Sequence, residues 1–132
     1  MKVIFTIEGE PQGKGRPRFG KHSVRTPEKT KAYENLIKYT YKTKAKHFFE
    51  GYVNMTINCY YAIAKSNTKK VKEQKLDNIL RPDKKPDIDN VLKVFGDALN
   101  GIAYKDDAQV IRTTCEKYYS DNPRVEVVLE DL

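Results

Sequence analysis

The feature that most constrains the fold is the stretch 53–61, in which apolar and polar side chains alternate along the chain. A period of two places the apolar side chains on one face of a β-strand, so the stretch predicts a strand with one buried face. The same alternation at 3–7 predicts a first strand. Two more strands are predicted at 109–119 and 124–129, joined by the turn-forming residues 120–123.

Helical patterns separate these strands. Thr26 as N-cap and Pro27 at the first helical position begin a predicted amphipathic helix that runs to about Phe49, before Gly51. A short exposed helix is predicted within the polar, basic segment 65–85. Together with a helix near residue 88, this predicts an α+β fold: a small mixed sheet of about four strands packed with two main helices, in the order β-α-β-(short α)-α-β-β. At 132 residues we expect a single domain, 1–132.

Charge is unevenly distributed along this chain of net charge +7. The first 85 residues carry 20 Lys or Arg against 8 acidic residues, whereas residues 86–107 carry 2 against 5. The basic excess is typical of nucleic-acid-binding proteins, although solvated surface is the better reading for any single lysine. No apolar run approaches the roughly 20 residues that span a bilayer. We therefore expect no membrane partner and a soluble, cytoplasmic protein.

The acidic residues are concentrated around a second amphipathic helix, predicted at 88–99. Its apolar side chains share one side, facing the sheet, while Asp89, Lys93, Asp97 and Asn100 form one polar stripe. Asp87 precedes the helix as an N-cap candidate, where exposed N–H groups and the helix dipole favour a carboxylate. Taken alone, such residues are more often a cap and a solvated face than a site.

A second acidic pair, Asp106 and Asp107, precedes the predicted strand 109–119. Hard divalent cations such as Mg²⁺ prefer carboxylate and water oxygens, and phosphate-cleaving enzymes commonly hold them with Asp side chains. If the sheet brings Asp107 beside the helix start, then Asp87, Asp89 and Asp107 form a metal cage. Lys93 would then offset charge on the cleaved phosphate.

Three ordered motifs add a family resemblance. They are Pro-Asp-Ile-Asp-Asn-Val-Leu-Lys at 86–93, Asp-Ala-Leu-Asn-Gly at 97–101 and Tyr-Lys-Asp-Asp-Ala-Gln-Val at 104–110, with a basic Gly-Lys-Gly-Arg-Pro-Arg loop at 13–18. The chain resembles the RusA family of Holliday junction resolvases, in its phage or Gram-positive type. The strong matching covers roughly 87–119, and the resemblance implies a RusA-like fold.

The resemblance also implies roles for individual residues. Asp87, Asp89 and Asp107 correspond to the metal-binding catalytic triad, Lys93 to a further catalytic residue, and Asp106 to an additional candidate ligand. It implies Mg²⁺ as cofactor, with Mn²⁺ able to substitute. It further implies a homodimer that acts on branched DNA, specifically four-way junctions, in the cytoplasm of a bacterial or phage-infected host cell.

These observations predict a Mg²⁺-dependent endodeoxyribonuclease that hydrolyses phosphodiesters and resolves Holliday junctions by paired symmetric nicks, in DNA recombination and repair. Lys14, Arg16 and Arg18, with the lysines of the first helix, are predicted to contact the DNA backbone without reading much sequence. Two alternatives remain open from the sequence. One is a broader branched-DNA nuclease that cuts flaps or forks, and the other is a non-catalytic nucleic-acid-binding module.

Overall fold

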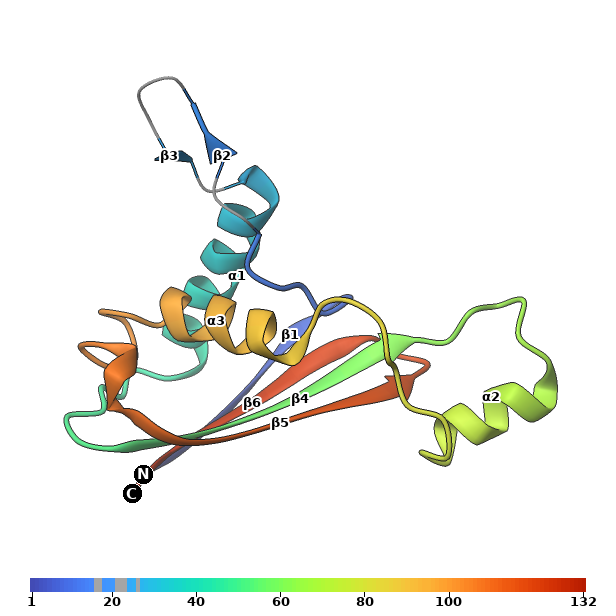
Figure 1. Cartoon of the computed structure of the whole chain (residues 1–132). Helices are drawn as coiled ribbons and strands as arrows, with labels where there is room; N and C mark the ends of the chain where they lie inside the picture. Colours follow the sequence, from blue (N-terminus) through green and yellow to red (C-terminus); the bar gives the residue numbers. More distant parts are fainter. Residues whose placement is uncertain (16–17, 21–23, 26) are drawn as a thin grey trace.

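The computed structural model describes the chain except for residues 16–17, 21–23 and 26 (Figure 1). Its main feature is a four-stranded mixed sheet with strand order β1-β6-β4-β5. Strands β4 and β5 are parallel, and the other two neighbouring pairs are antiparallel. This confirms the predicted α+β class and mixed sheet. The strands are β1 (Lys2–Glu8), β4 (Val53–Ala62), β5 (Val110–Ser120) and β6 (Arg124–Asp131).

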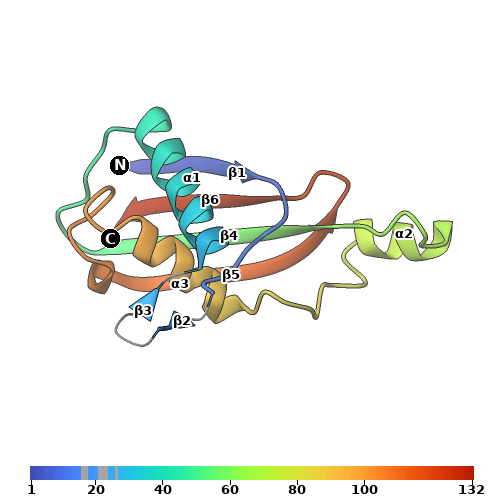
Figure 2. The same ribbon diagram turned by 90° about the horizontal axis from the view of Figure 1, so that it is seen from above.

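Two helices, α1 (Glu28–Lys44) and α3 (Ile88–Ala98), lie across one face of this sheet, as Figure 2 shows from above. The third, α2 (Lys69–Leu76), projects beyond the end of the sheet and has no buried residue, in agreement with the predicted short exposed helix. Among the described helices, none combines the length and apolarity needed to cross a membrane. Two small elements were not predicted: the hairpin of β2 (Arg18–Phe19) and β3 (Val24–Arg25), and the 3₁₀ turn η1 (Asp107–Gln109).

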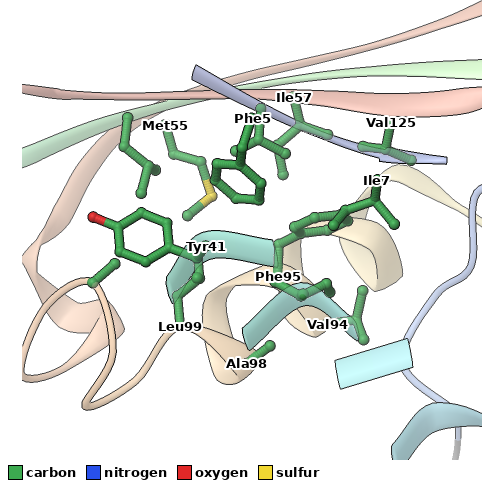
Figure 3. Close-up of a cluster of buried hydrophobic side chains, with 14 of the residues drawn as sticks. Phe5, Ile7, Tyr41, Met55, Ile57, Val94, Phe95, Ala98, Leu99 and Val125 are labelled. Carbon is green, nitrogen blue, oxygen red and sulfur yellow. The ribbon is translucent and has the colours of Figure 1, made fainter. Parts of the chain in front are cut away.

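The core lies between the sheet and the two covering helices (Figure 3). Along β4 every second side chain is buried, as the alternation predicts, and Met55 and Ile57 face the helices. From α3, Phe95 and Leu99 are fully buried against them. Burial of such side chains contributes about 1.5–3 kcal/mol each, so the apolar side of α3 fixes which way its polar stripe points. That stripe is left facing away from the core.

The predicted end of the first helix is wrong. Helix α1 ends at Lys44 rather than near Phe49, and Ala45 is already extended. The Tyr41 hydroxyl donates a 2.6 Å hydrogen bond to the His47 carbonyl, and the Phe49 N–H donates to Ala103 at 2.7 Å. Phe49 is thereby fully buried outside the helix. Tertiary contacts therefore override a helical spacing that continues in the sequence. At the other end of α1, the predicted N-cap Thr26 lies outside the described residues. Pro27, which was predicted as the first helical residue, is the N-cap instead.

Candidate active site

Helix α3 begins at the acidic motif. Asp87 is its N-cap, as predicted, but its carboxylate accepts no capping hydrogen bond from the described backbone. Asp89 lies in the first turn, and both side chains are exposed. The positive end of the helix dipole stabilises negative charge at this position. The helix start therefore fixes the backbone positions of both residues, and their exposed carboxylates are accessible to a ligand.

The segment before Asp87 is anchored to the sheet by side chains of β4 and β5. The Tyr61 hydroxyl donates a 2.9 Å hydrogen bond to the Pro86 carbonyl, next to Asp87. The Lys117 ammonium donates to the Lys84 carbonyl at 2.6 Å, and the Arg81 guanidinium donates to the Lys117 carbonyl at 2.6 Å. This irregular segment thus has a defined path because the sheet holds it. The sequence predicted Tyr61 only as a strand residue and did not indicate its contact with Pro86.

Asp107 is held against the far half of α3. Its backbone N–H donates a 2.7 Å hydrogen bond to the Asn100 side chain, so this member of the polar stripe positions Asp107. The Tyr104 hydroxyl, fully buried, donates to the Gly96 carbonyl at 2.9 Å. A Cβ at Gly96 would lie only 3.4 Å from Asp107 Oδ2. Close approach of the carboxylate therefore depends on the absent side chain of Gly96.

Gln109 fixes the acidic turn from the other side. Its Oε1 accepts hydrogen bonds from the N–H groups of Lys105, at 2.9 Å, and Asp106, at 3.2 Å. Its Nε2 donates at 2.9 Å to the carbonyls of Phe49 and Gly51. The Tyr104–Val110 motif is thus a rigid support for the Asp106–Asp107 pair. Gly96 and Gln109 were not singled out from sequence, although a glycine inside a helix is a signal of close packing.

The electrostatic environment of Asp107 is unfavourable for its negative charge. Partial burial, with the nearby carboxylates of Asp106 and Asp97, raises the pKa of Asp107 above its usual value. The side chain also borders a small pocket of about 110 Å³ whose walls include Leu92 and Thr113. Crowded carboxylates of this kind are stabilised by a bound cation.

The structure places the predicted site residues along one side of α3, but not around one point. Gly96, which contacts Asp107, is seven residues after Asp89, or about 10 Å along the helix axis. Lys93 lies between them and is exposed. Within the described part of the chain, no three His, Cys, Asp or Glu side chains are close enough together to hold a metal ion.

The side chains nevertheless supply carboxylate oxygens, the type of ligand that a hard divalent cation prefers. Mg²⁺ usually keeps several waters and takes only one or two protein carboxylates, with substrate phosphate supplying further oxygens. Asp87 and Asp89 at the helix start, and Asp106 and Asp107 beside its far half, are donors of this type. A closed protein cage is therefore not required for metal binding at this site.

The basic loop has a structural role in the part that is described. The Lys14 ammonium is 2.9 Å from Glu34 of α1 and 3.4 Å from Asp97 of α3, so it links the two helices. Its charge is compensated within the protein. Arg16, and the side chain of Arg18, lie outside the described residues. Contact of Lys14, Arg16 and Arg18 with DNA stays a prediction.

Comparison with known proteins identifies the class of the protein. The family described as Endodeoxyribonuclease RusA matches residues 8–130, which places the chain among the DNA-cleaving enzymes. The chain belongs to this family of Holliday junction endodeoxyribonucleases and is an enzyme that hydrolyses phosphodiester bonds. It is 39% identical over 137 residues to "Uncharacterized protein YqaN" of Bacillus subtilis (strain 168), covering 98% of this chain and 96% of that protein.

Proposed function

We propose that the protein is a Mg²⁺-dependent, structure-specific endodeoxyribonuclease that resolves four-way junctions by paired symmetric nicks. Membership of the RusA family supports the reaction and the substrate class. The observation that carries the proposal is the alignment of Asp87, Asp89, Lys93 and Asp107 along the solvent side of one helix. A phosphodiester lying on this side of α3 would meet carboxylates and a free ammonium together.

Each residue has a distinct proposed role. Asp87, Asp89 and Asp107, with Asp106 as a further ligand, would supply carboxylates for Mg²⁺, or for Mn²⁺ in its place. Because they form two groups about 10 Å apart along α3, water and substrate phosphate would complete the coordination. A cation bound there would supply Lewis-acid charge and lower the pKa of a bound water. Lys93, between the two acidic groups, would offset the negative charge that develops on the phosphate. The tethers from Asn100 and Tyr104 keep Asp107 oriented throughout.

The first experiment measures cleavage of a synthetic four-way junction by Asp87→Asn and Asp107→Asn. Asparagine caps helices as well as aspartate does, so Asp87→Asn should keep the fold. We expect cleavage to fall by roughly 100-fold or more, because removing one such charged group from a catalytic site typically costs that much. Junction binding, measured without divalent cation, should change by less than about twofold, because the phosphate contacts are made elsewhere.

The same assay tests the metal and the substrate. Chelation by EDTA should stop cleavage by the wild-type protein, and added Mg²⁺ should restore it. Flaps, forks and plain duplex serve as competing substrates, and efficient cutting of these would replace junction resolution by a broader branched-DNA activity. A folded Asp107→Asn variant that still cleaves at the wild-type rate, or cleavage that continues in EDTA, would overturn the assignment of the site.

A further inference from the structure

A groove of about 640 Å³ opens beside the start of α3. This volume lies within the range of ordinary ligand-binding sites. One wall is the loop after β1, which runs past the start of α3 to the start of α1 (Figure 1). The other wall is the segment before α3, including Lys84 and Lys85, and the start of α1 with Lys29 also lines the groove. With Tyr61 of β4, the groove is thus built from four separate segments of the chain.

The walls are held rigidly at the point where they meet α3. A Cβ at Gly13 would lie 2.8 Å from Asn90 Cβ and 2.9 Å from Pro86 Cβ, so the loop packs directly on the helix start. The Lys14 N–H donates to the Asn90 carbonyl at 3.0 Å, and the Gly15 N–H donates to Thr30 Oγ1 at 3.0 Å. The groove therefore exists before any ligand arrives.

The charged side chains of the groove that have no ion-pair partner among the described residues are positive. Lys29, Lys84 and Lys85 are exposed, and none of them is in an ion pair with a described residue. Lys14 also borders the groove, but Glu34 and Asp97 already compensate its ammonium. The only acidic side chain along the described walls is Glu10, whose Oε1 accepts a 3.0 Å hydrogen bond from the Ala62 N–H. Three lysines against one carboxylate favour an anionic ligand.

The position of the groove identifies that ligand. Pro86 and Asn90 line it, and they flank Asp87 and Asp89 in the sequence. A chain that follows the groove therefore reaches the start of α3, the element that carries these two carboxylates. A sugar–phosphate backbone has the repeated negative charge that separate lysines can bind, and such contacts place a strand without reading its sequence.

We propose that this groove is the path of the cleaved DNA strand next to its scissile phosphodiester, with Lys29, Lys84 and Lys85 pairing its phosphates. This inference rests on the proposed function, because it assigns the groove to the substrate of that site. It extends the sequence-based expectation, which gave DNA contact to Lys14, Arg16 and Arg18 with the lysines of the first helix. Lys84 and Lys85, from the segment before α3, are the cations that it adds.

The test measures the salt dependence of four-way-junction binding in EDTA for Lys84→Ala/Lys85→Ala. Each phosphate contact contributes about 0.9 to the slope of log affinity against log salt, so the double variant should lower the slope by about 1.8. Adding Lys29→Ala should lower it by about 0.9 more. The matched control is Lys44→Ala/Lys46→Ala, which removes the same charge at the other end of α1 and just after it.

The outcomes separate the groove from the catalytic assignment. An unchanged slope, or an equal fall in the Lys44→Ala/Lys46→Ala control, overturns the groove as the strand path. Asp107→Asn should keep the slope of the wild-type protein in this binding assay, and it should lose cleavage in the separate assay with Mg²⁺ if the proposed function holds. Loss of cleavage by Asp107→Asn with no effect at Lys84 and Lys85 would therefore overturn the groove alone, whereas persistent cleavage would overturn the proposed function.

Discussion

At the scale of single residues, the site depends on a side chain that is missing. Gly96 lies inside α3, where glycine costs about 1 kcal/mol of helix stability relative to alanine. The chain keeps it where Asp107 approaches the helix, and any Cβ there would press on the carboxylate. Asn100 and Tyr104 pull the same turn towards α3 through hydrogen bonds. The glycine therefore lowers the stability of α3 at the position where Asp107 packs against the helix.

The substitution Gly96→Ala should separate stability from activity. The alanine methyl would lie 3.4 Å from Asp107 Oδ2, so the carboxylate must move by a few tenths of an ångström. We expect a melting temperature equal to or above that of the wild-type protein, because of the gain in helix propensity, and a roughly tenfold loss of junction cleavage. Gly51→Ala, whose added Cβ meets open space, is the control. Full activity of Gly96→Ala would show that the close approach is not needed.

At the scale of secondary-structure elements, α3 is positioned at both ends by its neighbours. The sheet holds the segment before Asp87 through Tyr61 and Lys117, while the turn at Asp107 is tied to the far half of the helix. The loop after β1 packs between α1 and α3 through Gly13 and Gly15, which have no room for side chains. These contacts therefore hold both acidic groups at defined positions along α3.

Removing one of these attachments should loosen the start of α3. Tyr61→Phe deletes the hydroxyl that donates to the Pro86 carbonyl and should cost about 1 kcal/mol. We expect the Mg²⁺ concentration for half-maximal cleavage to rise by about fivefold, the equivalent of roughly 1 kcal/mol, because Asp87 is less well placed. Tyr60→Phe, on the other face of the same strand, is the control. An unchanged Mg²⁺ requirement, or an equal rise in both variants, would remove Tyr61 as a positioning residue.

At the scale of the whole molecule, one chain carries one set of Asp87, Asp89 and Asp107. A four-way junction has two strands to cut at equivalent positions. Two sites related by a two-fold axis match this symmetry, which is the reason to propose a homodimer. The helices cover one face of the sheet, and the projecting α2 extends the basic part of the chain away from it (Figures 1 and 2).

The dimer should be visible both as mass and as product. Light scattering should give twice the chain mass of 15.3 kDa. On a supercoiled plasmid with a cruciform, the wild-type protein should yield linear DNA, because both strands are cut before it dissociates. Mixed dimers of wild-type and Asp107→Asn chains should instead accumulate nicked circles. A protein that is monomeric when bound to a junction, or nicked circles as the main wild-type product, would contradict the proposal.

The sequence by itself determined the elements and the polar stripe. Alternation along 53–61 and helical spacing along 88–99 are local properties, because burial of one face imposes its period on the chain. They correctly predicted β4, α3 and the outward direction of Asp89 and Lys93. The family motifs at 86–93, 97–101 and 104–110 are likewise properties of the sequence alone.

Only the tertiary structure decided which of these parts meet. It placed Asp107 beside Gly96 rather than at the helix start, because hydrogen bonds to α3 and from Gln109 to the distant residues Phe49 and Gly51 hold the turn there. In the folded protein the ammonium of Lys14 forms ion pairs with Glu34 and Asp97, whereas Lys84 and Lys85 line a groove. Local periodicity contains no information about such contacts, since they arise when segments far apart in the sequence pack together.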